Sequence, residues 1–192
     1  MRPELKKFLQ DHRSLIEREK YTELYTELGT TLAKERSDYT NEMTEFLISC
    51  DMNPLDYMYQ VPIGYMKCST LLDHIVIPDH ITSVQRAAFI CSDLRTVTFN
   101  DTSKCTHIMQ FAFKGCEKLE SVILPECCTY IGTDAFRNCD WLESVCIPTK
   151  SPQVYIDEEA FAYCPYLTIY CNSGPVEDYC IQHNISYKLL GE

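Results

Sequence analysis

Residues 131–148 read IGTDAFRNCDWLESVCIP, and the spacing of their apolar residues returns along the second two-thirds of the chain. Each copy contains an Ile or Val, an Ala-Phe pair four residues later, and then a Cys and a Leu. The four pairs are Ala88-Phe89, Ala112-Phe113, Ala135-Phe136 and Ala160-Phe161. Self-similarity at about 23 residues is typical of a solenoid, in which each unit buries its apolar face only against its neighbours.

A short strand is predicted near the end of each copy. After the Leu come two apolar residues separated by one position: Val97/Phe99, Val122/Leu124, Val145/Ile147 and Ile169/Cys171, with a half repeat at Ile75/Ile77 before them. This alternation is typical of a half-buried strand, and a proline directly after it, such as Pro148, cannot continue the ladder. Stacked copies therefore predict a parallel sheet on one side of the solenoid, with the Ala-Phe segments crossing the other side.

The chain has twelve cysteines, and several follow the repeat. One stands after each Ala-Phe pair: Cys91, Cys116, Cys139 and Cys164. No C-x-x-C pair occurs, and no histidine lies at ligand spacing from a cysteine, so no metal site is predicted. The repeat cysteines are predicted to be small buried apolar residues.

Catalytic motifs are absent from the sequence. It contains no G-x-S-x-G, P-loop, GxGxxG or H-E-x-x-H, and its 6 glycines are too few for a phosphate-cradling loop. The cysteines and histidines allow many possible Cys–His nucleophile pairs, but a reactive thiol needs an electropositive, partly exposed setting. The chain is acidic, and most cysteines fall in slots predicted to be buried. We therefore predict no catalytic residues, no enzyme activity and no cofactor.

The pattern I-x3-A-F-x2-C-x2-L-x2-V-x-I-P resembles the BspA-like leucine-rich repeat over about residues 65–175. One copy matches it in full: Ile131, Ala135, Phe136, Cys139, Leu142, Val145, Ile147 and Pro148. The resemblance implies an α/β-type repeat solenoid, a leucine-rich-repeat stack with short parallel strands. In the first full repeat, Phe89 and Cys91 are one residue closer than elsewhere, and residues 103–107 lengthen the next connection. Both departures predict local bulges in the same fold.

Both ends of the solenoid are predicted to be capped, which divides the chain into 1–60, 61–171 and 172–192. Residues 1–60 have helical periodicity, and Gly174-Pro175 begins a predicted helix that a last strand follows. The N-terminal stripes are Leu5, Phe8, Leu9, His12, Leu15 and Ile16; Tyr21, Leu24, Tyr25, Leu28 and Leu32; and Met43, Phe46, Leu47 and Cys50.

Three helices of this size bury too little surface to fold alone with certainty, so we expect this head to pack on the open end of the repeats. The alternative is a separate helical domain that binds a partner. A short helical head on such repeats resembles some phage or prophage proteins.

The charge balance excludes several classes of partner. The chain has 17 basic and 28 acidic residues, which gives a formal net charge of −11. Nucleic acids and anionic lipid surfaces both require a basic footprint, so neither is an expected partner. No apolar run approaches the roughly 20 residues that span a bilayer, and the charged first 15 residues lack the apolar core of a signal peptide. A cytoplasmic protein is expected.

Strand alternation predicts which residues face outward from the sheet. The middle column consists of Val76, Thr98, Ile123, Cys146 and Tyr170. A flanking column consists of His74, Thr96, Ser121, Ser144 and Thr168, and next to it lie Asp73, Arg95, Glu120 and Glu143. An exposed apolar stripe with a polar rim is typical of a partner-binding surface. The alternative is that Ile123 and Cys146 are single exposed apolar residues without a role.

Three functions are compatible with these observations. The favoured one is a non-catalytic module that binds a protein partner through the strand face, the helical head or both. The alternatives are a phage-encoded inhibitor or decoy of a host defence protein, and a surface adhesin. Missing export and anchoring signals argue against the adhesin. A homodimer through an uncovered end of the solenoid is a further option.

Overall fold

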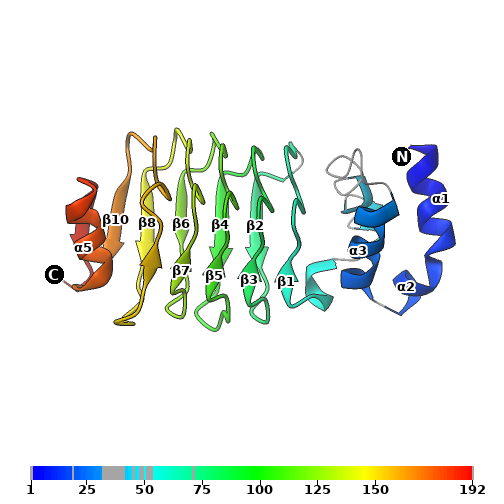
Figure 1. Ribbon diagram of the computed structural model, residues 1–192, viewed down its shortest axis with the longest axis horizontal. Helices are drawn as coiled ribbons and strands as arrows, with labels where there is room; N and C mark the ends of the chain where they lie inside the picture. Colours follow the sequence, from blue (N-terminus) through cyan, green and yellow to red (C-terminus); the bar gives the residue numbers. More distant parts are fainter. Residues whose placement is uncertain are drawn as a thin grey trace.

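The computed structural model describes residues 2–18, 20–31, 42–44, 46–47, 50, 54–70 and 72–191. Helices α1 (Pro3–Asp11), α2 (Arg13–Glu17) and α3 (Tyr21–Thr31) form a head at one end, and coils of chain stack away from it. Helix α5 (Pro175–Gln182) closes the other end (Figure 1). The predicted solenoid is confirmed, with its capping helices and closing strand.

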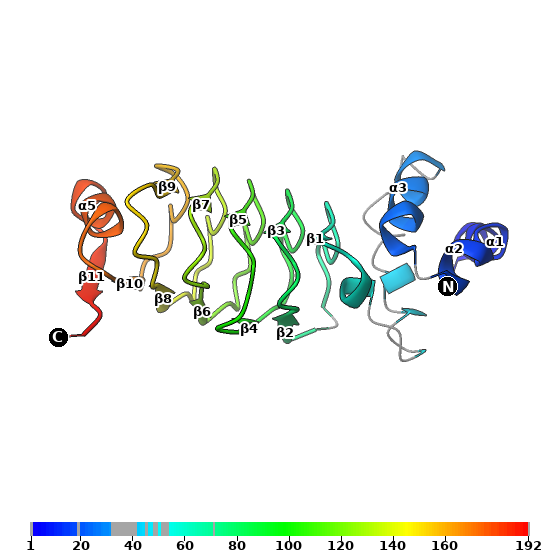
Figure 2. The same cartoon turned by 90° about the horizontal axis from the view of Figure 1, so that it is seen from below.

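Two parallel sheets run along opposite sides of the coils (Figure 2). The larger sheet has the order β11-β10-β8-β6-β4-β2. Its strands are β2 (His74–Ile77), β4 (Thr96–Phe99), β6 (Ser121–Ile123), β8 (Ser144–Ile147), β10 (Thr168–Cys171) and β11 (Ser186–Leu189). This is the predicted strand sheet, and each strand except β11 belongs to one copy of the repeat.

The smaller sheet was not predicted as a sheet. It contains β1 (Gln60–Val61), β3 (Ser83–Val84), β5 (His107–Ile108), β7 (Tyr130–Ile131) and β9 (Tyr155–Ile156), in that spatial order. Each strand has two residues and carries the Ile or Val that begins a copy of the repeat. Because two residues cannot show alternation, the sequence offers no strand signal there. On the outward face of this sheet, the rings of His107, Tyr130 and Tyr155 lie in a row, with consecutive ring centroids 5.4 and 5.1 Å apart.

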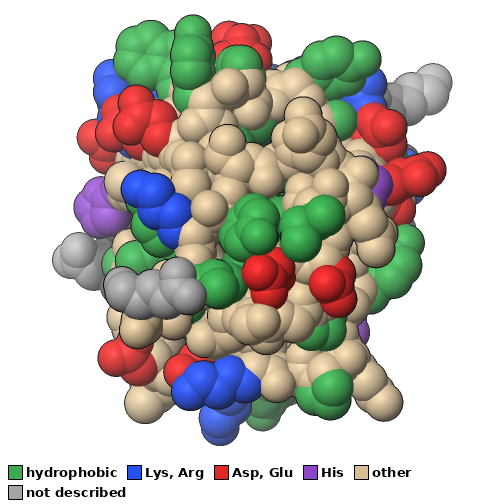
Figure 3. All heavy atoms as spheres, turned by 90° about the vertical axis from the view of Figure 1, so that its left-hand side faces the viewer, with side chains coloured by type: hydrophobic (Ala, Val, Ile, Leu, Met, Phe, Trp, Pro, Cys, Tyr) green, Lys and Arg blue, Asp and Glu red, His purple; other side chains and the backbone are tan. Residues whose placement is uncertain are grey.

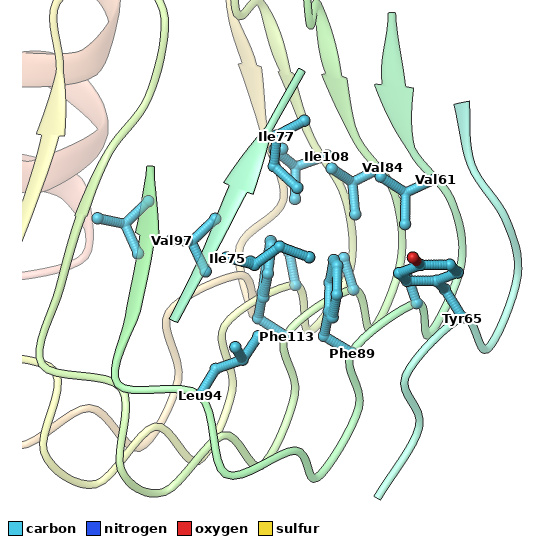
Figure 4. Close-up of a cluster of buried hydrophobic side chains, with 14 of the residues drawn as sticks. Val61, Tyr65, Ile75, Ile77, Val84, Phe89, Leu94, Val97, Ile108 and Phe113 are labelled. Carbon is cyan, nitrogen blue, oxygen red and sulfur yellow. The ribbon is translucent and has the colours of Figure 1, made fainter. Parts of the chain in front are cut away.

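The repeat phenylalanines form a stack through the core. Phe89, Phe113, Phe136 and Phe161 are buried, and consecutive rings lie 5.2 Å apart at interplanar angles of 4° to 11°. Tyr65 contacts Phe89 edge-on at 6.0 Å, beneath the apolar residues of both sheets (Figure 4). Offset ring packing of this kind adds to the hydrophobic gain of burying each ring. We call this row of rings the aromatic spine.

The spine continues into both caps. Tyr25 of α3 lies 5.9 Å from Tyr65, and Phe161 lies 6.4 Å from Tyr179 of α5. Head, coils and cap therefore share one continuous core, and the expected packing of the head on the first coil is confirmed. Met43 and Leu47 of the third stripe are buried as predicted, but Phe46 and Cys50 are exposed. Leu32 lies outside the described residues.

The C-terminal cap begins at a glycine. Gly174 has φ +127°, which a residue with a side chain rarely adopts, and Pro175 follows it as the first residue of α5. Val176, Tyr179 and Cys180 of α5 are buried. The outer surface of this end carries scattered hydrophobic side chains among charged and polar groups (Figure 3). Strand β11 lies at the edge of the larger sheet, so the homodimer hypothesis stays open at this strand.

The repeat cysteines act as hydrogen-bond donors. The thiols of Cys116, Cys139 and Cys164 donate to the carbonyl oxygens of Phe89, Phe113 and Phe136 at 3.1, 3.2 and 3.1 Å. Each thiol thus joins its own coil to the preceding one. The sequence pattern predicted small buried apolar residues in these slots. Cys116 and Cys139 are buried as predicted, whereas Cys164 is half-buried, and the structure adds a polar contact to all three.

The prediction for Cys91 was wrong. Ser92 is buried and touches Cys116 at 3.4 Å, so Ser92 fills the slot of this coil, while Cys91 is exposed. The missing residue therefore falls between Ser92 and Leu94, not between Phe89 and Cys91. Cys91 instead matches Gly115 of the next coil, since both have positive φ, of 55° and 70°.

Burial predicts which thiols react. It raises the pKa of Cys105, Cys116 and Cys128 to about 12, so these thiols stay protonated at pH 8. With iodoacetamide at pH 8, the exposed Cys50, Cys68 and Cys91 should be alkylated in the native protein, and the three buried cysteines only after unfolding. Peptide mass mapping checks this order. Rapid native labelling of Cys116 would contradict it.

Candidate binding surface

The predicted middle column is continuous in the structure. Strand pairing places the five residues side by side across β2, β4, β6, β8 and β10, in the order Val76, Thr98, Ile123, Cys146 and Tyr170. Val76 is 45% and Ile123 is 63% exposed, while Cys146 and Tyr170 are half-buried. We call these five residues the strand row. The next residue in the row, Lys188 of β11, holds its ammonium 5.6 Å from the centre of the Tyr170 ring.

The strand row has the outward positions that alternation requires. In each strand, the residues before and after the row residue point into the core, such as Ile75 and Ile77 around Val76. A residue between two buried neighbours on a strand must face the opposite side. Burial also raises the pKa of the half-buried Cys146 thiol. This residue therefore contributes a neutral, weakly polar surface next to Ile123.

The charged column lies directly before the strands. It contains Asp73, Arg95, Glu120 and Glu143, and backbone N–H groups link it from coil to coil. The Arg95 guanidinium and the Glu120 carboxylate form an ion pair at 2.8 Å. Lys118 and Asp93, from the turns before this column, pair at 2.6 Å. Among the described residues, Glu143 has no ion-pair partner.

A pocket of about 450 Å³ opens beside the charged column. It is lined by Glu120, Trp141, Glu143 and Tyr166, and we call it the Trp141 pocket. Trp141 and Tyr166 are 60% and 70% exposed. They occupy equivalent positions in adjacent coils, five residues after Phe136 and Phe161.

Trp141 and Tyr166 were not among the predicted site residues, although both Glu120 and Glu143 were. Trp141 and Tyr166 lie in the turns that precede β8 and β10. Strand alternation does not predict the direction of a side chain in a turn. One signal was present in the sequence: Trp141 is the chain's single tryptophan, and the other full copies of the repeat hold Asp93, Lys118 and Tyr166 at its position.

A second hollow lies in the helical head. Its volume is about 540 Å³, and most of the residues that line it are of polar types: Asp11, His12, Ser14, Leu15, Glu23, Thr26 and Glu27. His12 is oriented by a 2.9 Å contact between its Nδ1 and the Phe8 carbonyl oxygen. Binding by the head stays a prediction.

The described residues contain no group of three or more His, Cys, Asp or Glu side chains placed to hold a metal ion. Within the same ranges, every helix is too short or too polar to cross a bilayer. The larger sheet thus presents the outward-facing strand row, a charged border that contains the Arg95–Glu120 ion pair, and a small pocket.

These coils carry the sequence pattern of the BspA type leucine rich repeat region, which matches residues 64–187 in six copies. The match covers more than half of the chain, and the protein belongs to this family of leucine-rich repeat proteins. The resemblance inferred from the repeat spacing is thereby confirmed. No curated protein matches the sequence.

Two solved structures are similar to this chain. The first is a leucine rich cell surface protein from Faecalibacterium prausnitzii, with 27% identity and a TM-score of 0.54 over 64% of this chain and 31% of that one. The second is the pneumococcal vaccine antigen PcpA, with 15% identity and a TM-score of 0.41 over 70% of this chain and 44% of that one. This chain therefore spans less than half the length of either protein.

The phage-inhibitor hypothesis stays a prediction.

Proposed function

We propose that this protein is a non-catalytic interaction module that binds a protein partner through the strand row and its charged border. The observation that carries the proposal is the continuity of the row across five paired strands, with Ile123 63% exposed at its centre. Exposed apolar surface framed by polar groups is a common feature of protein interfaces. Leucine-rich repeat solenoids offer extended surfaces of this kind.

The test compares two isoleucines of similar exposure. Ile123 lies in the strand row, and Ile181, which is 59% exposed, lies on α5. Burying an isoleucine side chain in an interface contributes about 1.5–3 kcal/mol, so Ile123→Ser should weaken binding roughly tenfold or more. Ile181→Ser should leave binding unchanged.

Partners would be captured from extracts of the source organism and of the cells it meets. Their affinity for the wild type and both variants would then be measured by calorimetry. Equal binding by wild type and Ile123→Ser, for every captured partner, would remove the strand row from the proposed function. Loss of binding on Ile181→Ser alone would move the interface to the C-terminal cap.

A cytoplasmic location is part of the proposal. Cys116, Cys139 and Cys164 each donate a hydrogen bond through a thiol, a role that requires the reduced form. Reducing compartments keep thiols in this form. Fractionation of the source cells, followed by immunoblotting, tests the location.

A surface adhesin is the second candidate. It is favoured by the 27% identity to a leucine rich cell surface protein. In that case the strand row would contact a ligand outside the cell. Protection of the protein from an added protease in intact cells supports the cytoplasmic proposal, and its digestion supports the adhesin.

A further inference from the structure

The lining of the Trp141 pocket combines aromatic side chains with carboxylates. The aromatic side chains are those of Trp141 and Tyr166, and the carboxylates are those of Glu120 and Glu143. The four residues come from adjacent coils, so the repeat itself brings them together. The pocket volume of about 450 Å³ is enough for one large side chain.

The aromatic walls remain available to a ligand. Other aromatic columns of this protein close on themselves, such as Tyr130 and Tyr155 with centroids 5.1 Å apart. Trp141 and Tyr166, both within the described part of the chain, make no ring contact with each other. They flank the pocket and leave ring surface exposed to solvent. The faces of such rings carry negative electrostatic potential, which attracts cations.

Among the described residues, the two carboxylates of the pocket differ in their ion pairing. Glu120 is matched by Arg95 at 2.8 Å, and the nearby Lys118 is matched by Asp93 at 2.6 Å. Glu143 has no ion-pair partner among the described residues. Glu143 therefore lines the pocket as a carboxylate without an ion pair in the described part of the chain. A cation bound in the pocket would supply a counter-charge to Glu143.

An arginine side chain has the chemistry that fits. Its guanidinium is planar, stacks on aromatic faces and offers several N–H donors to a carboxylate at the same time. A lysine ammonium is a compact, strongly hydrated charge that uses the ring faces less well. We propose that the Trp141 pocket binds an arginine side chain of the protein partner, a proposal that rests on the proposed function. The apolar neighbours of that arginine then lie along the strand row, next to Ile123 and Cys146.

The protein carries its own reporter for this proposal. Trp141 is the only tryptophan in the chain, so intrinsic tryptophan fluorescence arises entirely from the pocket wall. The probe is the peptide acetyl-Gly-Arg-Gly-amide, titrated into the full chain. Its citrulline analogue has nearly the same shape without the charge, and its lysine analogue has the charge without the planar group.

We expect a saturable change in Trp141 fluorescence with the arginine peptide, at least fivefold weaker binding of the lysine peptide, and no saturation with the citrulline peptide. Glu143→Gln should weaken arginine binding at least fivefold, and Tyr166→Ala should do the same. Glu126→Gln, which removes an exposed carboxylate outside the pocket lining, should leave it unchanged. Circular dichroism checks that each variant is folded.

Several results would overturn the proposal. Equal responses to the arginine and citrulline peptides would show that charge is not recognised, and equal affinity for arginine and lysine would show a general cation pocket. An undiminished affinity in Glu143→Gln would place the binding elsewhere. These outcomes are separate from the fate of the proposed function, because the peptide titration needs no partner and the Ile123→Ser comparison needs no pocket. A partner lost on Ile123→Ser but bound normally by Glu143→Gln would retain the strand row and reject the arginine pocket.

Discussion

Replacing Phe136 by alanine is expected to lower the free energy of unfolding by about 3–5 kcal/mol. The Phe136 ring is fully buried at the centre of the aromatic spine, 5.2 Å from both Phe113 and Phe161. Its removal leaves a cavity between two coils, and neighbouring backbones held by parallel strand pairing cannot close it. Urea unfolding followed by circular dichroism measures the change.

The control for Phe136 is Tyr130, which also stacks on a neighbour but outside the core. Its ring lies 5.1 Å from Tyr155 and is only half-buried. Tyr130→Ala should cost about 0.5–1.5 kcal/mol, because it loses a ring contact without opening a cavity. If both variants lost the same stability, surface stacking and not core packing would hold the coils together.

Replacing Asp134 by valine is expected to lower the free energy of unfolding by about 3 kcal/mol, the second large effect. Asp134 is buried and has φ 55°, a conformation that costs an L-residue roughly 1–2 kcal/mol and is worst for β-branched side chains. Its carboxylate also contacts Lys114 at 2.5 Å and Arg137 at 3.4 Å. Valine therefore adds backbone strain and leaves two partly buried cations without this partner.

Asp134→Asn separates these two causes. Asparagine tolerates positive φ and keeps one side-chain oxygen, so its cost should be about 1 kcal/mol, from the weakened charge pairing alone. Thermal unfolding of both variants, at low and high salt, provides the measurement. A cost for asparagine equal to that for valine would assign the whole effect to charge and contradict the strain argument.

The sequence predicted the larger sheet and the strand row because both depend only on the repeat period and on the two-residue alternation of a strand. Once consecutive copies are aligned, a residue between two buried strand positions faces outward in every coil, as Val76 and Ile123 do. The same reasoning placed Glu120 and Glu143 together. What these residues bind stays a prediction.

The errors arose where counting residues is not enough. A deletion in the coil of Phe89 can be placed before or after Cys91, and the structure decides between the two through the burial of Ser92 and the positive φ that Cys91 shares with Gly115. The two-residue strands of the smaller sheet carry no alternation. Trp141 and Tyr166 were missed because they lie in turns, where side-chain direction depends on the coil geometry and not on a sequence period.

The uniform spacing of the aromatic spine has a consequence for how this protein can change over generations. Every junction between full coils presents the same ring at 5.2 Å and nearly the same angle, so each coil is an interchangeable module. Duplication or loss of one whole coil would keep every remaining junction intact and leave both caps in place. Each such event would add or remove one residue in the strand row. The length of the contact surface can therefore be adjusted to a partner independently of the fold that supports it.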